Sequence, residues 1–362
     1  MSESWHTAWC LGRMILSITE LFDKARARIA VPDYVLKEAR KRRDLIRDIV
    51  EQEFANLRTF PSGSLAHGTH NDPLNDADAG VVLDRRMYED LGPDGEGPCA
   101  IVEEVRSMLR ERLKEDYPNA RFYTGGHRAI RINFMEPIEL GADNFTIDFI
   151  VAVRRDEGGV WIPDLDNDEW NPSHPERHVE LVIARNKATE SHFARILRLA
   201  KHANARHGKT IVSFNVMALG LEAITEKVSL PEGLALLLRH AADSLDKGLT
   251  EDPAGVSGLI KVNVSRRKDA SKRFKTLADL AEEALELNAD GQTAQAQRNW
   301  SKVLPDAIDP PHEEDLKAEL AAELRKGNER VRQGAGGMTV SGTASIGVPS
   351  ARAYGDKNSR TG

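Results

Sequence analysis

The stretch Asp76-Ala77-Asp78-Ala79-Gly80-Val81-Val82-Leu83 places two carboxylates in front of a short apolar run. Residues 79–83 are predicted to form a β-strand, because the run is short, apolar and follows a turn-rich segment. In an extended chain, residues i and i+2 share a face, so Asp76 and Asp78 can lie side by side, roughly 6–7 Å apart along the strand. The stretch therefore predicts a pair of acidic groups at the beginning of a strand.

A second β candidate, residues 145–153, carries one carboxylate in its middle. Its apolar residues alternate strictly and should face a core together; they are Phe145, Ile147, Phe149, Val151 and Val153. Asp148 must then point to the opposite face. A carboxylate inside an apolar strand needs a partner or a metal, so Asp148 is a candidate functional residue.

The residue types Asp76, Asp78 and Asp148 are suited to divalent metal ions. Mg²⁺ prefers oxygen ligands and keeps waters and phosphates in its remaining positions. Three carboxylates from two neighbouring strands can hold two ions about 3.5–4 Å apart. We therefore expect two Mg²⁺ ions, with Mn²⁺ as an alternative. One ion would lower the pKa of an attacking hydroxyl, and the other would steady a triphosphate and its pyrophosphate leaving group.

Gly63 and Ser64 stand in the turn-rich segment 61–78, ahead of the acidic pair. A glycine lets the backbone N–H approach a phosphate closely, and a serine hydroxyl adds a donor. By itself a Gly-Ser pair mostly marks a turn, and an Asp-x-Asp pair often marks a solvated loop end. In the order Gly-Ser, Asp-x-Asp and strand Asp, the three together predict phosphoryl-type transfer, which asks a protein mainly for positioning and charge stabilisation.

The remaining periodicity predicts an α/β (α+β) protein with a small mixed sheet and a helical C-terminal half. Residues 129–134 add a strand, and helices are predicted over 33–57, 101–113, 192–207, 213–224, 232–247 and 271–288. We expect a core domain over 1–175 that includes an N-terminal helix, and a helical domain over 176–332. Residues 333–362 have almost no large apolar side chains and are predicted to be a disordered tail.

The composition favours a cytoplasmic protein with small-molecule substrates. A net charge of −7 and a pI near 5.9 argue against a stably bound nucleic-acid template. Cys10 and Cys99 show no metal-ligand spacing, and neither do the histidines, so a reducing compartment and supporting roles for histidine are expected. The most apolar N-terminal stretch, residues 9–18, is too short and too polar for a membrane span.

The chain resembles the nucleotidyltransferase superfamily related to polymerase beta, whose pattern is Gly-Ser, Asp-h-Asp and a later h-Asp-h, where h is apolar. The matching residues are Gly63-Ser64, Asp76-Ala77-Asp78 and Ile147-Asp148-Phe149. Within it the chain looks most like the bacterial cGAS/DncV-like nucleotidyltransferases, the signal synthases of CBASS anti-phage systems, with oligoadenylate synthases more distant. The resemblance spans about residues 33–305, and further stretches that carry it are 68–69, 159–164, 170–175, 180–182, 195–201 and 213–214. Ala77 and Gly80 stand where bulkier apolar residues are common, which we expect to loosen the strand.

The resemblance implies a polymerase-beta-like sheet core, an oligoadenylate-synthase-like helical domain and a set of site residues. Ser64 would touch the triphosphate of the donor nucleotide, and Asp76, Asp78 and Asp148 would bind Mg²⁺. Lys201 matches a helical lysine that reaches donor phosphates in relatives, and Ser213 often lies close by.

It also implies an activity and partners. A ribose hydroxyl of one nucleotide would attack the α-phosphate of another nucleoside triphosphate, and a second such step would close a cyclic di- or oligonucleotide. ATP and another NTP would be the substrates, and an effector protein would sense the product. In several CBASS operons an E1/E2-like enzyme conjugates the synthase through its flexible C-terminus, which here ends at Gly362.

Two other functions fit the sequence. A template-independent transferase would add nucleotides to RNA, or AMP to a protein or a small molecule; the acidic composition argues mildly against RNA. A catalytically inactive fold would serve as a binding module, but the retained carboxylates and Gly63-Ser64 argue against this alternative.

Overall fold

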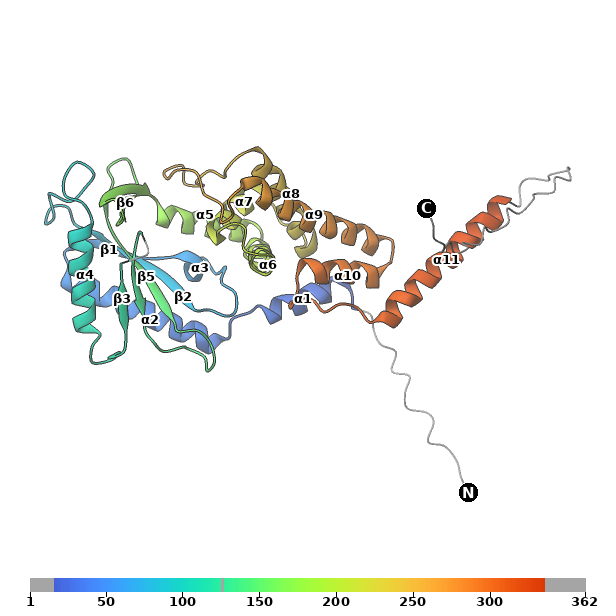
Figure 1. Cartoon of the computed structure of the whole chain (residues 1–362), viewed down its shortest axis with the longest axis horizontal. Helices are drawn as coiled ribbons and strands as arrows, with labels where there is room; N and C mark the ends of the chain where they lie inside the picture. The colour runs from blue at the N-terminus through green and yellow to red at the C-terminus, as the bar shows by residue number, and fades with distance from the viewer. Residues whose placement is uncertain (1–15, 125–126, 336–362) are drawn as a thin grey trace, which may run out of the picture. The chain divides into compact units, whose positions relative to one another are not determined.

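The computed structural model describes residues 16–124 and 127–335. They divide into one compact unit that extends to His312 and a second unit that begins at Glu313. The first unit contains the sheet and most of the helices (Figure 1).

The described residues include a mixed sheet of seven strands. The strands are β1 (Asn56–Ser62), β2 (Asp76–Leu83), β3 (Arg121–Tyr123), β4 (Ile130–Asn133), β5 (Thr146–Arg154), β6 (Val160–Asp164) and β7 (Glu169–Ser173). Their order is β1-β2-β5-β4-β3, and β6 joins β5 to β7. β2 and β5 are parallel neighbours, and the other pairs are antiparallel. The predicted mixed sheet is confirmed, and it places the two acidic strands next to each other.

Two helices cover one face of this sheet. Apolar residues of α2 (Asp33–Glu53) and α4 (Cys99–Arg112) share a core with those of β2, β4 and β5. On β5 the alternation is as predicted, because Ile147, Phe149, Val151 and Val153 are fully buried. Asp148 therefore lies on the opposite face, away from α2 and α4.

The helical half has a separate hydrophobic core. It contains α5 (Pro175–Ala188), α6 (His192–Arg206), α7 (Ser213–Ala223), α8 (Leu230–Lys247), α9 (Arg267–Ala289) and α10 (Thr293–Val303). The N-terminal helix α1 (Ile18–Arg28) joins this second core, where the Phe22 ring meets the Trp300 ring edge-on at 4.8 Å. The predicted helices over 192–207, 213–224, 232–247 and 271–288 correspond to α6, α7, α8 and α9.

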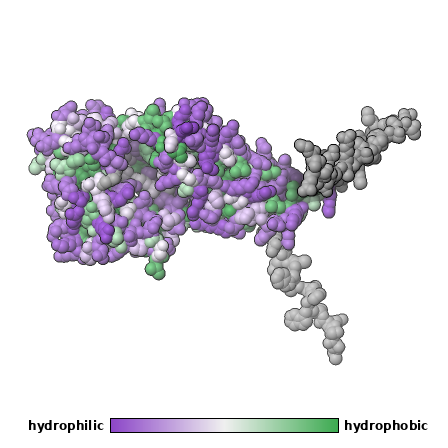
Figure 2. Space-filling view, in the orientation of Figure 1, coloured by the Kyte–Doolittle hydropathy of each residue, from purple (hydrophilic) through white to green (hydrophobic). Residues whose placement is uncertain are grey.

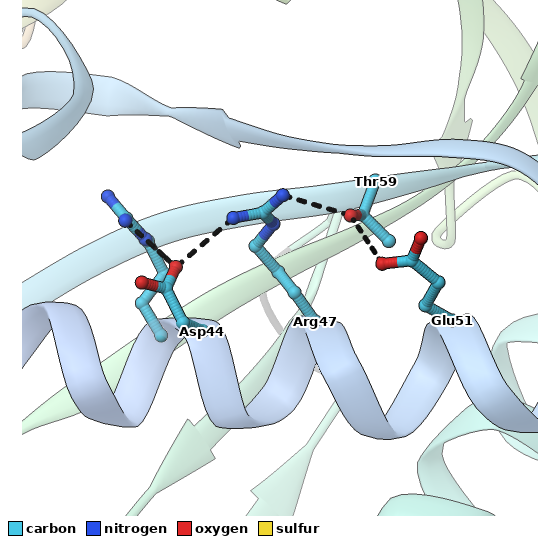
Figure 3. Close-up of polar contacts among 5 residues, drawn as sticks. Asp44, Arg47, Glu51 and Thr59 are labelled. Carbon is cyan, nitrogen blue, oxygen red and sulfur yellow. Dashed lines mark hydrogen bonds and ion pairs between the residues drawn. The ribbon is translucent and has the colours of Figure 1, made fainter.

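The first predicted helix is too long at its end. It was expected over 33–57, but α2 ends at Glu53, Phe54 is extended and residues 56–62 form β1. Figure 3 shows the polar contacts that tie the two elements together: Arg47 on α2 donates to Asp44 and to Thr59 on β1, and the Thr59 hydroxyl donates to Glu51. Phe54 is buried ahead of β1, whereas Leu57 on β1 is exposed, so the apolar spacing at these two residues does not mark another helical turn.

Gly80 supports β2 and does not loosen it. A Cβ at this position would lie 2.5 Å from the Phe60 ring and 2.7 Å from the Ile150 carbonyl oxygen. The glycine makes room for Phe60, which is buried against Val82 and Ala152. β2 is continuous and paired along both edges, so the expected loosening is not observed.

The second unit contains α11 (Glu313–Ala335). This helix includes the first three residues of the predicted tail, and the remainder, with Gly362, lies outside the described residues. The predicted domain boundary at residues 175 and 176 lies inside the first unit and stays a prediction. Most buried apolar residues over 31–170 before it belong to one hydrophobic core, but Leu21, Phe22, Ala25 and Ile29 belong to the other, together with buried apolar residues over 182–308.

None of the described helices combines the length and the hydropathy that a membrane span requires. The face of the molecule drawn in Figure 2 is mostly hydrophilic, with apolar residues gathered in small areas.

Candidate active site

Two of the predicted site residues, Asp78 and Asp148, lie in one row across the sheet. Ser62 on β1 is opposite Asp78 on β2, and Asp78 is opposite Asp148 on β5. Neighbouring strands are about 4.8 Å apart, so side chains in such a row are in reach of each other. Asp76 lies two residues before Asp78 on the same face of β2. The sheet therefore brings Asp148 next to the pair Asp76 and Asp78, which lies about 70 residues earlier in the sequence.

A cavity of about 500 Å³ lies over this part of the sheet. One wall comes from the sheet half, with Asp76, Asp78, Gly63, Ser64 and the loop that connects α3 (Gly63–Ala66) to β2. The opposite wall comes from α5, α6, α7 and the loop before α7, with His178, Lys201, Lys209, Ser213 and Phe214. The volume is in the range of small-molecule sites.

Gly63 is required by the position of Asp78. Its φ angle is +68°, and a Cβ there would lie 1.7 Å from Oδ2 of Asp78. The sequence indicated a glycine that lets a phosphate approach, and the structure adds a second reason. Only a glycine leaves space for the Asp78 carboxylate beneath the turn.

Asp76 and Asp78 carry unfavourable charge in the protein as it stands. Burial, followed by the charges of Asp76 and Asp148, raises the pKa of Asp78 to about 7. Partial burial and then the charge of Asp148 also raise the pKa of Asp76. Among the described residues, neither carboxylate has a hydrogen-bonded or ion-paired side-chain partner. Such a pair is stabilised by a bound cation.

Lys201 reaches the cavity from α6. Its ammonium group donates to the Thr69 hydroxyl at 2.8 Å and to the Thr69 carbonyl oxygen at 3.1 Å. Burial lowers the pKa of Lys201 to about 8, while Asp76 and Asp78 act in the opposite direction. The structure thus places this lysine in the pocket rather than on a solvated helix face. Ser213 begins α7 on the same wall.

Asp148 is paired with an arginine that sequence reasoning missed. Arg131 on β4 is opposite Asp148 in the register and donates to both of its oxygens, at 2.8 and 2.7 Å. The signal was present in the sequence, because Arg131 alternates with the buried Ile130 and Ile132 and must share a face with Asp148 if the strands are neighbours. Only the pairing of β4 with β5 turns that signal into a contact.

Three histidines of the cavity were also missed as site residues. Burial lowers the pKa of His67 to about 3 and that of His70 to about 4, so both rings are neutral. His178 bonds through Nε2 to Asp252 at 2.6 Å, and its ring meets Phe214 edge-on. Their spacing in the sequence carries no motif, because they come from a loop and from a helix more than 100 residues later.

The carboxylates fit a divalent ion in their chemistry, although they are not gathered around one. Asp76 and Asp78 are unpaired oxygen ligands on one strand face, whereas the oxygens of Asp148 are held by Arg131. Within residues 16–124 and 127–335, no three His, Cys, Asp or Glu side chains are already arranged as a metal site. An ion that binds Asp148 therefore meets oxygens that already accept from Arg131.

Comparisons with known proteins point to one group. A cyclic AMP-AMP-AMP synthase of Escherichia coli (strain MS 115-1) is 27% identical over 153 residues, which cover 41% of this chain and 43% of that protein. The match thus spans less than half of the curated relative. No family model matches the chain.

Solved structures resemble the chain over most of its length. The E. coli MS115-1 CdnC structure with ATP has a TM-score of 0.61 at 15% identity and covers 82% of this chain and 100% of that one. The Bradyrhizobium diazoefficiens CD-NTase CdnG in complex with GTP has a TM-score of 0.58 at 16% identity and covers 83% and 96%. The Vibrio cholerae DncV cyclic AMP-GMP synthase has a TM-score of 0.52 at 13% identity and covers 80% and 87%.

The chain has the cGAS/DncV-like nucleotidyltransferase fold. The resemblance seen in the sequence is confirmed. Asp76, Asp78 and Asp148, called the acidic row below, lie on the sheet half together with the Gly63-Ser64 turn. Lys201 and Ser213 face this side of the cavity from the helical half.

Proposed function

We propose that the protein is a Mg²⁺-dependent nucleotidyltransferase that joins nucleoside triphosphates into a cyclic di- or oligonucleotide and releases pyrophosphate. The observation that carries the proposal is the row of Asp78 and Asp148 on adjacent parallel strands, with Asp76 beside it and Lys201 across the cavity. Relatives of the same fold are named as cyclic AMP-AMP-AMP and cyclic AMP-GMP synthases, which supports this reaction over other transfers.

The residues of the site would bind either the nucleotide phosphates or the ions. Gly63 and Ser64 would bind the phosphates of the donor nucleotide through a backbone N–H and a hydroxyl. The Lys201 ammonium group would offset phosphate charge, and Ser213 would add a hydroxyl donor from the start of α7. Asp76, Asp78 and Asp148 would hold two Mg²⁺ ions, with Mn²⁺ as an alternative. Bound Mg²⁺ supplies a lowered pKa for the attacking hydroxyl and charge stabilisation for the pyrophosphate.

The reaction balances without another reactant. The attacking ribose hydroxyl gives up its proton to water and forms a bond to the α-phosphorus, and the bond from that phosphorus to the bridging oxygen of the leaving pyrophosphate breaks. A second step of the same kind, within the linear intermediate, closes the ring. Positioning and charge stabilisation are the main requirements of such a transfer.

The proposed reaction also implies substrates and protein partners. ATP and another NTP would be the substrates, as CdnC with ATP and CdnG with GTP suggest for this fold. An effector protein would sense the product in anti-phage defence, and an E1/E2-like enzyme would conjugate Gly362. Co-expression with such an enzyme, followed by mass spectrometry, contradicts the conjugation if Gly362 never appears in an isopeptide or thioester bond.

Incubation of the full chain with ATP, GTP, CTP, UTP and Mg²⁺ tests the activity. We expect pyrophosphate release and a phosphatase-resistant product of cyclic mass. Asp76→Asn/Asp78→Asn should lose the activity, because two ion ligands disappear. The matched control is Asp243→Asn/Asp246→Asn, which removes two exposed carboxylates from α8. Without pyrophosphate release from any NTP the proposal fails, and labelled nucleotide on an added tRNA or protein would favour the template-independent transferase.

A further inference from the structure

Arg131 and Asp148 form a bidentate ion pair at the edge of the acidic row. Nε of Arg131 donates to Oδ1 at 2.8 Å and Nη2 donates to Oδ2 at 2.7 Å, so one guanidinium occupies both oxygens. The two residues are directly opposite in the antiparallel register of β4 and β5. A planar fork that matches a carboxylate in this way is specific to arginine.

The other two carboxylates of the row are in a different state. Among the described residues, Asp76 and Asp78 have no hydrogen-bonded or ion-paired side-chain partner, and both lie in the wall of the cavity. A cation that arrives there displaces no side-chain partner. A cation that uses Asp148 must compete with Arg131 for the same two oxygens and must also approach its positive charge.

We propose that Arg131 is a positioning residue that sets the order in which the pocket takes up divalent ions. Asp76 and Asp78 bind the first ion. Asp148 becomes an ion ligand only when Arg131 releases it, so the second ion binds more weakly. This inference rests on the proposed function, because it assigns the same three carboxylates to ion binding.

The released guanidinium has a natural second partner. Arginine binds phosphate oxygens as readily as carboxylates, and nucleotide phosphates are the anions expected beside this row. Release of Asp148 would then coincide with the arrival of a nucleotide, which would keep the pocket from assembling its full ion set without substrate.

Mn²⁺ binding to the nucleotide-free full chain tests the order without any catalysis. Titration followed by electron paramagnetic resonance should show a tighter and a weaker class of sites in the wild type. Asp148→Asn should lack the weaker class, which identifies it. Arg131→Gln should tighten the weaker class alone, by about twofold to fivefold, the range that corresponds to a half-exposed ion pair.

Two further variants separate pairing from charge and from folding. Arg131→Lys keeps the charge but loses the fork, so it should tighten the weaker class in the same direction and by less. Arg58→Gln is the matched control, because Arg58 forms an equally bidentate and half-exposed pair with Glu176, at 2.8 and 2.6 Å. It should leave both classes unchanged.

The outcomes distinguish this inference from the proposed function. An unchanged or weakened second class in Arg131→Gln overturns the role of Arg131, and so does a lysine variant that equals the wild type. A nucleotide-free wild type that binds no Mn²⁺ overturns the inference, whereas absence of pyrophosphate release with NTPs and Mg²⁺ contradicts the proposed function itself. An equal tightening in Arg58→Gln overturns the inference as well, because the effect would then be one of net charge.

Discussion

The two walls of the cavity differ in charge and in the way their residues are held. The sheet wall presents Asp76 and Asp78 from one strand, at positions that the backbone ladder determines. The helical wall presents Lys201 and Lys209, of which Lys201 is oriented by hydrogen bonds to the opposite wall through Thr69. The acidic wall suits cations and the basic wall suits phosphates, so a complex of Mg²⁺ with a triphosphate needs both.

The sheet wall depends on exact placement more than the helical wall does. Carboxylates on adjacent strands are placed by the register, and a shift by one residue would turn them to the other face. Lys201 comes from a helix in another core, and its side chain is long and adjusts more easily. Damage to the sheet wall should therefore cost more activity than equal damage to the helical wall.

After the loss of activity expected for Asp76→Asn/Asp78→Asn, the largest effect is expected from Gly63→Ala on the sheet wall. A Cβ would lie 1.7 Å from Oδ2 of Asp78, so the carboxylate must move. A displacement of this size is expected to reduce the rate of pyrophosphate release by about 100-fold. Gly68→Ala is the control, because Gly68 has a similar φ of +67° with no atom within 4 Å. An equal loss in both variants would mean that backbone strain, and not the contact with Asp78, is responsible.

Lys201→Met should weaken the binding of nucleotide phosphates by the helical wall. Loss of a charged donor to a phosphate is expected to raise KM for the NTPs by about 10- to 100-fold, with a smaller effect on kcat. Steady-state kinetics with Lys209→Met, which removes an exposed lysine of the same wall, provides the comparison. A larger effect from Lys209→Met would show that Lys209 is the main phosphate ligand.

When no ion is bound, the charge of Asp78 on the sheet wall should lower the stability of the folded protein. The pKa of Asp78 is raised to about 7 from 3.8, so the folded protein holds the proton of this carboxyl more tightly than the unfolded chain does. The stability that the protonated form contributes is lost as the pH rises from about 4 through 7. In EDTA, Asp78→Asn should therefore be more stable than the wild type at pH 8, by about 1–3 kcal/mol, and much less so at pH 4. Urea unfolding at both pH values measures this. A variant that is less stable at pH 8 would contradict the unfavourable charge.

The smallest effect is expected from His67→Gln. The pKa of His67 is lowered to about 3 from 6.5, so the stability that its neutral form contributes is lost as the pH falls from 6.5 toward 3. Between pH 7 and pH 5.5, the free energy of unfolding of the variant should fall by about 1 kcal/mol less than that of the wild type. Unfolding of both proteins at the two pH values is the measurement, and parallel losses would show that His67 is solvated.

Local patterns predicted the parts of the site that lie within one element. The alternation around Asp148 determines its face, and the spacing of Asp76 and Asp78 places them on one face of a strand. The same reasoning failed at residues 54–57, where apolar spacing was taken for helix although the chain turns into β1. Local periodicity does not distinguish the last turn of a helix from the first contacts of a strand.

Side-chain direction repeats with the period of a helix or strand, so the amino-acid sequence predicts candidate site residues and the face of its own element that each occupies. Tertiary structure alone decided that Asp78 and Asp148 are neighbours, that Arg131 holds Asp148, and that Lys201 reaches Thr69 across the cavity. Those contacts depend on strand order and on how two hydrophobic cores meet. Both arise from interactions between residues tens to more than a hundred positions apart, which no local pattern encodes.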